Sequence, residues 1–143
     1  MCYNINVSNN KIYFEIKYTE PQYGRSSGRI VNRETFKNVY SKHLSSINEE
    51  FHNADSFYFE YQVLRNLIHI DDESYVVFVY PKDNTGISKG VDKIKKEILK
   101  LEYFDHFFTI DWNNLYEYIS KNIVISKLQE HYTEFNSKYL QYK

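Results

Sequence analysis

Two short alternations of apolar and polar residues open the chain and predict an antiparallel hairpin. The first alternation carries three apolar residues, Tyr3, Ile5 and Val7. The second carries four on one strand face, Ile12, Phe14, Ile16 and Tyr18. Ser8-Asn9-Asn10 lies between them and suits a turn, because Asn tolerates positive φ. Pro21 is expected to end the second strand, since proline cannot continue a central ladder.

Helical spacing follows in two stretches. Asn32 suits the N-cap of a helix over residues 33–47, and Asp55 or Ser56 suits the N-cap of a second helix that ends near His69. The second helix has an apolar stripe made of Phe59, Val63, Leu67 and Ile70. Both stretches are therefore predicted to pack one face against a core.

The continuous apolar run YVVFVY, residues 75–80, differs from the earlier alternations. Such a run fits a strand buried on both faces, so it is expected in the middle of the sheet, and Pro81 ends it. A loop over residues 82–87 then leads to a helix over residues 88–101. The apolar stripe of that helix consists of Val91, Ile94, Ile98 and Leu101.

The last part of the chain predicts a strand over residues 105–110, a helix capped by Asp111 and a final helix over residues 124–140. The predicted order is therefore β-β-α-α-β-α-β-α-α. Helices between the later strands allow parallel crossovers. We expect a single α/β domain over residues 1–143, with a mixed central sheet flanked by helices.

Composition narrows the class of protein. The chain has 143 residues, of which 42% are hydrophobic, and this suits one compact domain. No apolar run reaches membrane-spanning length and the first ten residues lack signal-peptide features, so a cytoplasmic protein is expected. The 18 basic and 19 acidic residues give a net charge of −1, so binding of nucleic acid would need a local basic patch. Cys2 is the only cysteine, which excludes an internal disulfide and a cysteine-based zinc site.

Glu15 and Lys17 are the first candidates for chemistry. They lie two residues apart on a predicted strand, so they point from the same face. A carboxylate there can bind Mg²⁺, and the neighbouring ammonium can hold an attacking water. The plain alternative is an exposed Glu–Lys pair on a solvated strand face, because such a short motif matches many unrelated chains.

Three longer segments carry more information than the Glu–Lys pair. These are IYFEIKYTEP, the helical EYQVLRNLIHI and the strand segment SYVVFVYPKDN. Together they resemble a bacterial group of restriction-endonuclease-like proteins in the PD-(D/E)XK superfamily, over about residues 5–119. The resemblance implies a restriction-endonuclease-like fold, Mg²⁺ as the cofactor and DNA as the substrate.

The resemblance also implies roles for individual residues. Glu15 would bind the metal and Lys17 would be the catalytic lysine. Gln62 would support the site from the following helix, with Arg65 and Asn66 one turn further along on the same side. Glu20 would be a supporting carboxylate at the exit of the motif strand.

The chain departs from the family pattern near its start. The first acidic residue of the pattern falls at about Cys2, and no Asp or Glu precedes Glu15. Asn4 and Asn6 are the nearest oxygen donors, and a neutral amide binds Mg²⁺ less well than a carboxylate. The helix and strand that open the superfamily core also have no counterpart. The chain is thus expected to be the C-terminal part of a longer family pattern, with the acidic ligand coming from a partner, a preceding segment or a substitute residue.

Other polar residues are weaker candidates. Lys82 and Asn84 follow the central strand, where ligands gather in open α/β sheets, so they are candidate phosphate contacts, with an ordinary turn as the alternative. Asp71-Asp72-Glu73 is interpreted as a group of solvated turn acids, because a calcium loop needs more alternating ligands and a glycine. The histidines show no i, i+4 pair of the zinc-hydrolase kind.

Two functional hypotheses follow. The first is a Mg²⁺-dependent DNA phosphodiester hydrolase, potentially homodimeric, in which Glu15, Lys17 and Gln62 form the site. The alternative is a non-catalytic remnant that binds nucleic acid or a protein partner. A small interaction domain unrelated to nucleases would become attractive if Glu15 and Lys17 faced solvent.

Overall fold

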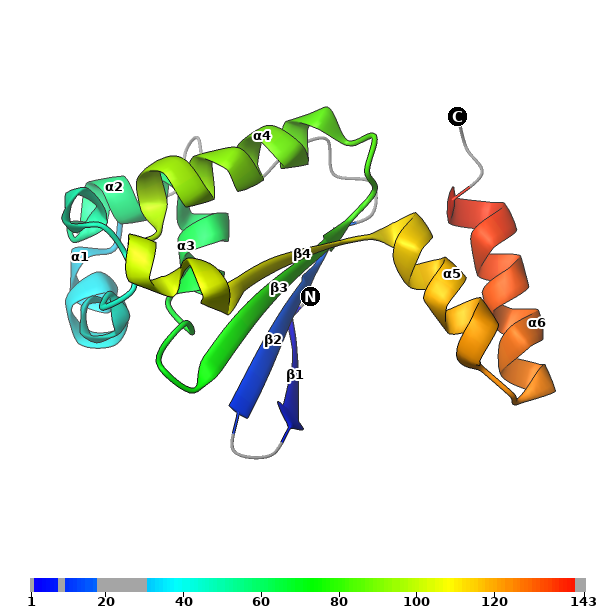
Figure 1. Ribbon diagram of the computed structural model, residues 1–143. Helices are drawn as coiled ribbons and strands as arrows, with labels where there is room; N and C mark the ends of the chain where they lie inside the picture. The colour runs from blue at the N-terminus through cyan, green and yellow to red at the C-terminus, as the bar shows by residue number, and fades with distance from the viewer. Residues whose placement is uncertain (1, 8–9, 18–30, 141–143) are drawn as a thin grey trace.

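A four-stranded mixed sheet forms the centre of the protein in the computed structural model, which describes residues 2–7, 10–17 and 31–140 (Figure 1). The strands are β1 (Cys2–Val7), β2 (Asn10–Ile16), β3 (Ser74–Tyr80) and β4 (Phe107–Asp111), in the spatial order β1-β2-β3-β4. Strand β1 pairs antiparallel with β2, whereas β2, β3 and β4 run parallel. The predicted hairpin, the mixed sheet and the interior position of β3 are confirmed.

The described part of the chain has six α-helices beside the sheet: α1 (Arg33–Thr35), α2 (Ala54–Phe59), α3 (Tyr61–Leu67), α4 (Thr85–Lys93), α5 (Trp112–Asn122) and α6 (Ser126–Phe135). Three π-helical turns, Phe36–Tyr40, Ile94–Ile98 and Asn136–Leu140, extend α1, α4 and α6. Three 3₁₀ segments complete the described helical structure, Ser41–His43, Glu49–Phe51 and Leu101–His106. The predicted order of strands and helices is confirmed.

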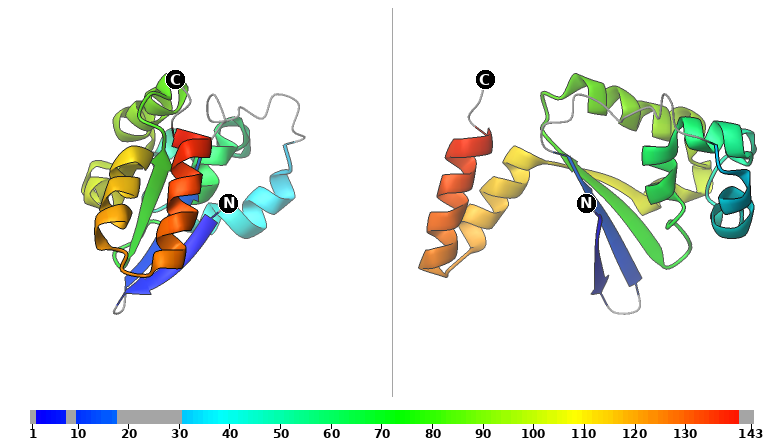
Figure 2. Two further views of the ribbon diagram at one scale, coloured as in Figure 1. Left: turned by 90° about the vertical axis from the view of Figure 1, so that its right-hand side faces the viewer. Right: turned by 180° about the vertical axis from the view of Figure 1, so that it is seen from behind.

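The sheet lies between two helical layers. On its first face, Val76 and Phe78 belong to a core with residues of α2, α3 and α4. On its second face, Val77 and Val79 pack with Trp112 at the start of α5 and with neighbouring apolar residues of α5 and α6. Alternate residues of β3 are thus buried on opposite faces, as a continuous apolar strand predicts. Figure 2 shows α5 and α6 in front of the sheet in its left view.

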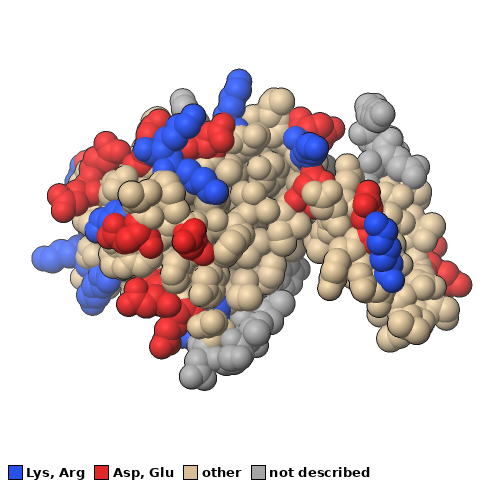
Figure 3. Space-filling model, viewed as in Figure 1, with Lys and Arg blue, Asp and Glu red and all other residues tan. Residues whose placement is uncertain are grey.

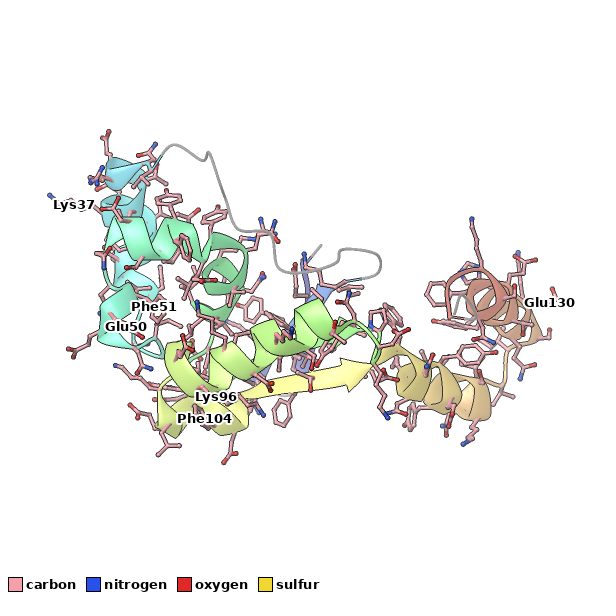
Figure 4. All side chains as sticks on the ribbon, turned by 90° about the horizontal axis from the view of Figure 1, so that it is seen from above. Lys37, Glu50, Phe51, Lys96, Phe104 and Glu130 are labelled. Atoms are coloured by element: carbon pink, nitrogen blue, oxygen red, sulfur yellow. The ribbon has the colours of Figure 1, made fainter. Side chains whose placement is uncertain are left out.

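Helices α5 and α6 form a hairpin that stands apart from α1–α4. Seen from above, the sheet separates this hairpin from the other helices, and Glu130 lies on its outer side (Figure 4). Trp112 is the buried residue of α5, and the described side chains of α6 are not fully buried. The hairpin therefore contributes mainly the cover of the second sheet face.

Two predicted helices have different boundaries in the structure. The first ends at His43 rather than Ile47, because Ile47 pairs instead with Leu99 in an isolated antiparallel bridge. The second begins at Ala54 and is interrupted at Glu60, so it consists of α2 and α3. Its N-cap is Asn53, whose side chain accepts a hydrogen bond from the Ser56 amide at 2.9 Å. The prediction of Asp55 or Ser56 as the cap is therefore wrong.

Differences of the same kind occur further along. Helix α4 begins at Thr85 instead of residue 88, because the Asn84 side chain caps it. Leu101 is 76% exposed in a 3₁₀ segment, and Phe59 is 53% exposed, so neither belongs to the core that its stripe predicted. Strand β4 begins two residues later than predicted. The caps Asn32 and Asp111 are confirmed by hydrogen bonds from backbone amides.

Some predictions lie outside the described residues. These concern the turn at Ser8-Asn9, the strand continuation through Tyr18, and Glu20 and Pro21. Among the described residues no helix is long and apolar enough to cross a membrane. Figure 3 shows lysine and arginine side chains interspersed with acidic ones over the visible face, in keeping with the near-neutral net charge.

Candidate active site on the second strand

Strand β2 holds the Glu–Lys motif between two neighbouring strands. Glu15 lies opposite Cys2 on β1 and opposite Phe78 on β3. Lys17 follows the last residue of β2, and its backbone amide still donates to the Val79 carbonyl at 2.9 Å. The Lys17 carbonyl accepts a hydrogen bond from the Trp112 indole at 3.0 Å. The backbone of the motif is therefore fixed from both sides.

Both motif side chains are buried. Glu15 is 1% exposed and Lys17 is 6% exposed, and the Lys17 Nζ lies 3.2 Å from the Glu15 Oε1. Within the described part of the chain, these two are the charged side chains that are buried. The interpretation of a solvated Glu–Lys pair is therefore wrong, because the first sheet face is covered by helices.

Residues in register across a parallel sheet share a face, so Glu15 lies on the same face as Phe78. That face is packed by α3 and α4. Desolvation of two charges is costly, and an ion pair offsets the cost only in part. A buried pair of this kind is accordingly a stronger indication of a functional site than the sequence motif alone.

The end of α3 lies near strand β2. The rings of Tyr13 and His69 stack at 4.4 Å, and this contact fixes the end of α3 beside the first half of β2. A helix that connects two parallel strands runs back against them.

Three predicted site residues lie on α3. Gln62 is half-buried, and Asn66 is buried and donates from its side-chain amide to the Gln62 carbonyl at 2.8 Å. Asn66 and Gln62 thus share one side of the helix, as predicted. The guanidinium of Arg65 lies over the Tyr61 ring, 5.8 Å from its centroid.

The remaining predicted contacts lie between β3 and α4. Lys82 is exposed in the loop that follows β3. Asn84 has a structural role, because its side-chain oxygen accepts a hydrogen bond from the Ile87 amide at 3.0 Å at the start of α4. Asp71 accepts from the Glu73 amide, also at 3.0 Å, and is exposed, which agrees with a solvated turn.

In the buried pair, the Glu15 carboxylate is the group that can bind a metal ion. Within the described residues, no group of three or more His, Cys, Asp or Glu side chains is placed to hold one. Mg²⁺ commonly binds through one or two carboxylates and takes its other ligands from water and substrate phosphates. Glu15 is of the residue type that fits this role, and the register places Cys2 opposite it.

Two polar residues at the carboxyl ends of the parallel strands were not predicted as site residues. Burial, with Asp92 nearby, raises the pKa of Tyr80. Asp111 lies opposite Tyr80, and its Oδ2 is buried and has no hydrogen-bond partner among the residues that the structure describes. The sequence signal for Asp111 was only that of a helix cap, which its Oδ1 satisfies.

Comparison with known proteins places the chain in a family. The chain matches, over residues 3–140, the model of a family described as "Restriction Endonuclease associating with ARP". No curated protein and no solved structure gives a significant match. Because the match spans nearly the whole chain, the protein belongs to this restriction-endonuclease family.

Proposed function

We propose that the protein is a Mg²⁺-dependent DNA phosphodiester hydrolase of the PD-(D/E)XK type, with its active site at Glu15 and Lys17. The observation that carries the proposal is the buried ion pair, 3.2 Å long, on one face of an interior strand. Membership of a restriction-endonuclease family supports a nuclease-related role and DNA as the partner.

Each residue of the proposed site has a distinct task. The Glu15 carboxylate would hold Mg²⁺, which when bound stabilises negative charge on the phosphate and increases the acidity of a bound water. Lys17, held beside Glu15, would orient the attacking water and stabilise the negative charge that develops on it. The low exposure of both side chains strengthens these electrostatic effects, because little water screens them.

Helix α3 would brace the site. Gln62 lies on the first turn and would hold a water or the Glu15 carboxylate through its side-chain amide, while Asn66 fixes the backbone of the same helix face. Arg65, and Lys82 beyond the end of β3, would contact DNA phosphates. Glu20 would add a supporting carboxylate, and Asn84 would contribute through its backbone, since its side chain caps α4.

The test is cleavage of duplex DNA by the full chain with Mg²⁺ and with EDTA. We expect cleavage with Mg²⁺ alone, and its loss in Glu15→Gln. Glu60→Gln is the matched control, because Glu60 is also ion-paired with a lysine, Lys93, at 2.5 Å. Cleavage by Glu15→Gln at the wild-type rate, or no cleavage by the wild type, would refute the proposal.

A further inference from the structure

The second face of the sheet is covered unevenly. Trp112 of α5 and Phe135 of α6 pack with Val77 and Val79, toward the carboxyl ends of the parallel strands. Figure 1 shows α5 leaving the end of β4 and diverging from the sheet toward the other ends of the strands. On that side Phe108 is 49% exposed. An apolar sheet face normally packs against a second layer, so the described elements leave this layer incomplete.

The incompletely covered part carries rings and apolar side chains, which we call the aromatic patch. It consists of residues that are all at least partly exposed: Ile12, Phe14, Tyr75, His106 and Phe108. In the register of the sheet, Tyr75 pairs with Ile12, and Val77 pairs with Phe14 and Phe108. Paired residues share a face, so the patch lies on the face of Val77 and not on that of Glu15.

Contacts between its rings hold the aromatic patch in place. The Tyr75 ring stacks on His106 with a centroid distance of 4.7 Å and lies 6.2 Å from the Phe108 ring. The Nδ1 of His106 lies 3.0 Å from the Ser74 carbonyl oxygen, and this hydrogen bond fixes the imidazole. A partner that binds the patch therefore meets a preformed surface and loses little affinity to the ordering of side chains.

Acidic residues border the aromatic patch where β3 and β4 begin. This acidic rim consists of exposed residues that precede the two strands: Asp71, Asp72, Glu73, Glu102 and Asp105. Within the described residues, none of these carboxylates forms an ion pair. Lys11, in register with Ser74, and Lys100 offset only part of the negative charge. Figure 3 shows acidic side chains gathered at the end of the molecule where β3 begins.

Charge and polarity together define what can bind here. The rings and apolar side chains favour a partner with apolar side chains, because contact withdraws both surfaces from water. The acidic rim favours lysine or arginine beside those side chains and repels the phosphates of DNA. An amphipathic helix with a basic polar face combines both properties, and a helical layer is what covers the rest of this sheet face.

We propose that the aromatic patch and the acidic rim are a docking surface for a basic amphipathic helix of a protein partner. The apolar side of that helix packs on Tyr75 and Phe108, and its lysines or arginines pair with the acidic rim. The inference is independent of the proposed hydrolysis, because Glu15 and Lys17 lie on the opposite face of the sheet.

The experiment is fluorescence anisotropy of a labelled helical peptide with the full chain. The probe is about 18 residues long, with leucines on one face of the helix and lysines on the other. It should bind saturably, whereas a matched peptide with glutamates in place of the lysines should bind at least about tenfold more weakly. Phe108→Ser should weaken binding of the lysine peptide about tenfold, as expected for one half-exposed ring. Phe59→Ser is the matched control, since Phe59 is 53% exposed on α2, and it should bind as the wild type does.

The acidic rim is tested in the same assay with a double variant that leaves the aromatic patch intact. Asp72→Asn with Glu73→Gln should weaken binding of the lysine peptide about threefold at low salt and hardly at all at high salt. Glu49→Gln with Glu50→Gln is the matched control, because these acids are also exposed and adjacent. It should bind the peptide as the wild type does.

Several results would overturn the inference. These are no binding of the lysine peptide, equal binding of the glutamate peptide, and unchanged binding by both Phe108→Ser and the double variant of the acidic rim. Weaker binding of duplex DNA by Phe108→Ser than by the wild type would assign the patch to nucleic acid instead. A wild-type dimer in sedimentation that Phe108→Ser converts to a monomer would assign it to a second copy of the chain.

Discussion

The Nζ of Lys17 lies 3.2 Å from the Oε1 of Glu15, and the two residues are 6% and 1% exposed. Both come from one face of β2, beneath the helical layer that includes α3 and α4. Two charges in such a place cost more in desolvation than a surface pair does. This buried ion pair is therefore more typical of a functional site than of an interaction that stabilises the fold.

Replacing both Glu15 and Lys17 should show whether the ion pair stabilises the fold. Glu15→Met or Lys17→Met alone leaves a buried charge and should cost about 3–5 kcal/mol of unfolding free energy. The double variant Glu15→Met, Lys17→Met removes both charges at similar volume and should be as stable as the wild type, or more stable by about 1–4 kcal/mol. Urea unfolding of the four proteins measures these differences. A double variant less stable than either single one would contradict the interpretation.

The cap of α2 offers a local test of the fold. Asn53→Ala removes the side-chain acceptor of the Ser56 amide and should cost about 1 kcal/mol. Asp55→Ala removes only an exposed ion pair with Arg33 and should cost less than about 0.5 kcal/mol. The same unfolding measurement compares the two. A larger loss for Asp55→Ala would mean that the helix begins at a different residue.

His69 should make stability depend on pH. Its pKa is lowered, first by burial and then by His43. The unfolded chain therefore binds a proton more readily, so the unfolding free energy should fall as pH decreases through the ordinary value and on through the lowered one. The check is unfolding of the wild type and His69→Gln at about pH 7.5 and about pH 5.5. Equal losses in the two proteins would show that His69 does not contribute.

The register of the hairpin predicts that an added carboxylate on β1 would tighten Mg²⁺ binding. Cys2 lies opposite Glu15, so Cys2→Asp would add a second carboxylate on the strand next to Glu15. The Mg²⁺ concentration for half-maximal cleavage should fall about tenfold, because each added charged ligand tightens metal binding.

The control for that change is Asn6→Asp. It adds the same charge four residues further along β1, opposite Lys11. It should leave the Mg²⁺ dependence unchanged. An equal effect of both variants would indicate a general effect of charge instead of a metal ligand at position 2.

Much of the fold followed from the sequence because its patterns were unambiguous. The alternation around Glu15 and the run around Val77 predicted strands, since few helices bury residues at such spacing. Asn32 and Asp111 were identified as caps because each directly precedes a helical pattern. Asn53 was missed because three cap-forming residues stand within four positions. Burial of Ala54 and Phe57 decides among them.

The burial of the Glu–Lys pair could not be predicted in the same way. The motif places both side chains on one strand face, but its pattern is identical whether that face meets water or helices. The covering layer comes from residues about forty or more positions later along the chain, such as Leu64 and Leu67. The aromatic support of Arg65 likewise needs Tyr40 and Tyr61 to meet, which no local spacing encodes.

The most direct test of the account is single-turnover cleavage of duplex DNA by three proteins in Mg²⁺: the wild type, the double variant Glu15→Met, Lys17→Met, and Lys93→Met. Lys93→Met also removes an ion-paired lysine, but one on α4 that binds Glu60. The account predicts cleavage by the wild type and Lys93→Met, and none by the folded double variant. Cleavage by the double variant at the wild-type rate would contradict it.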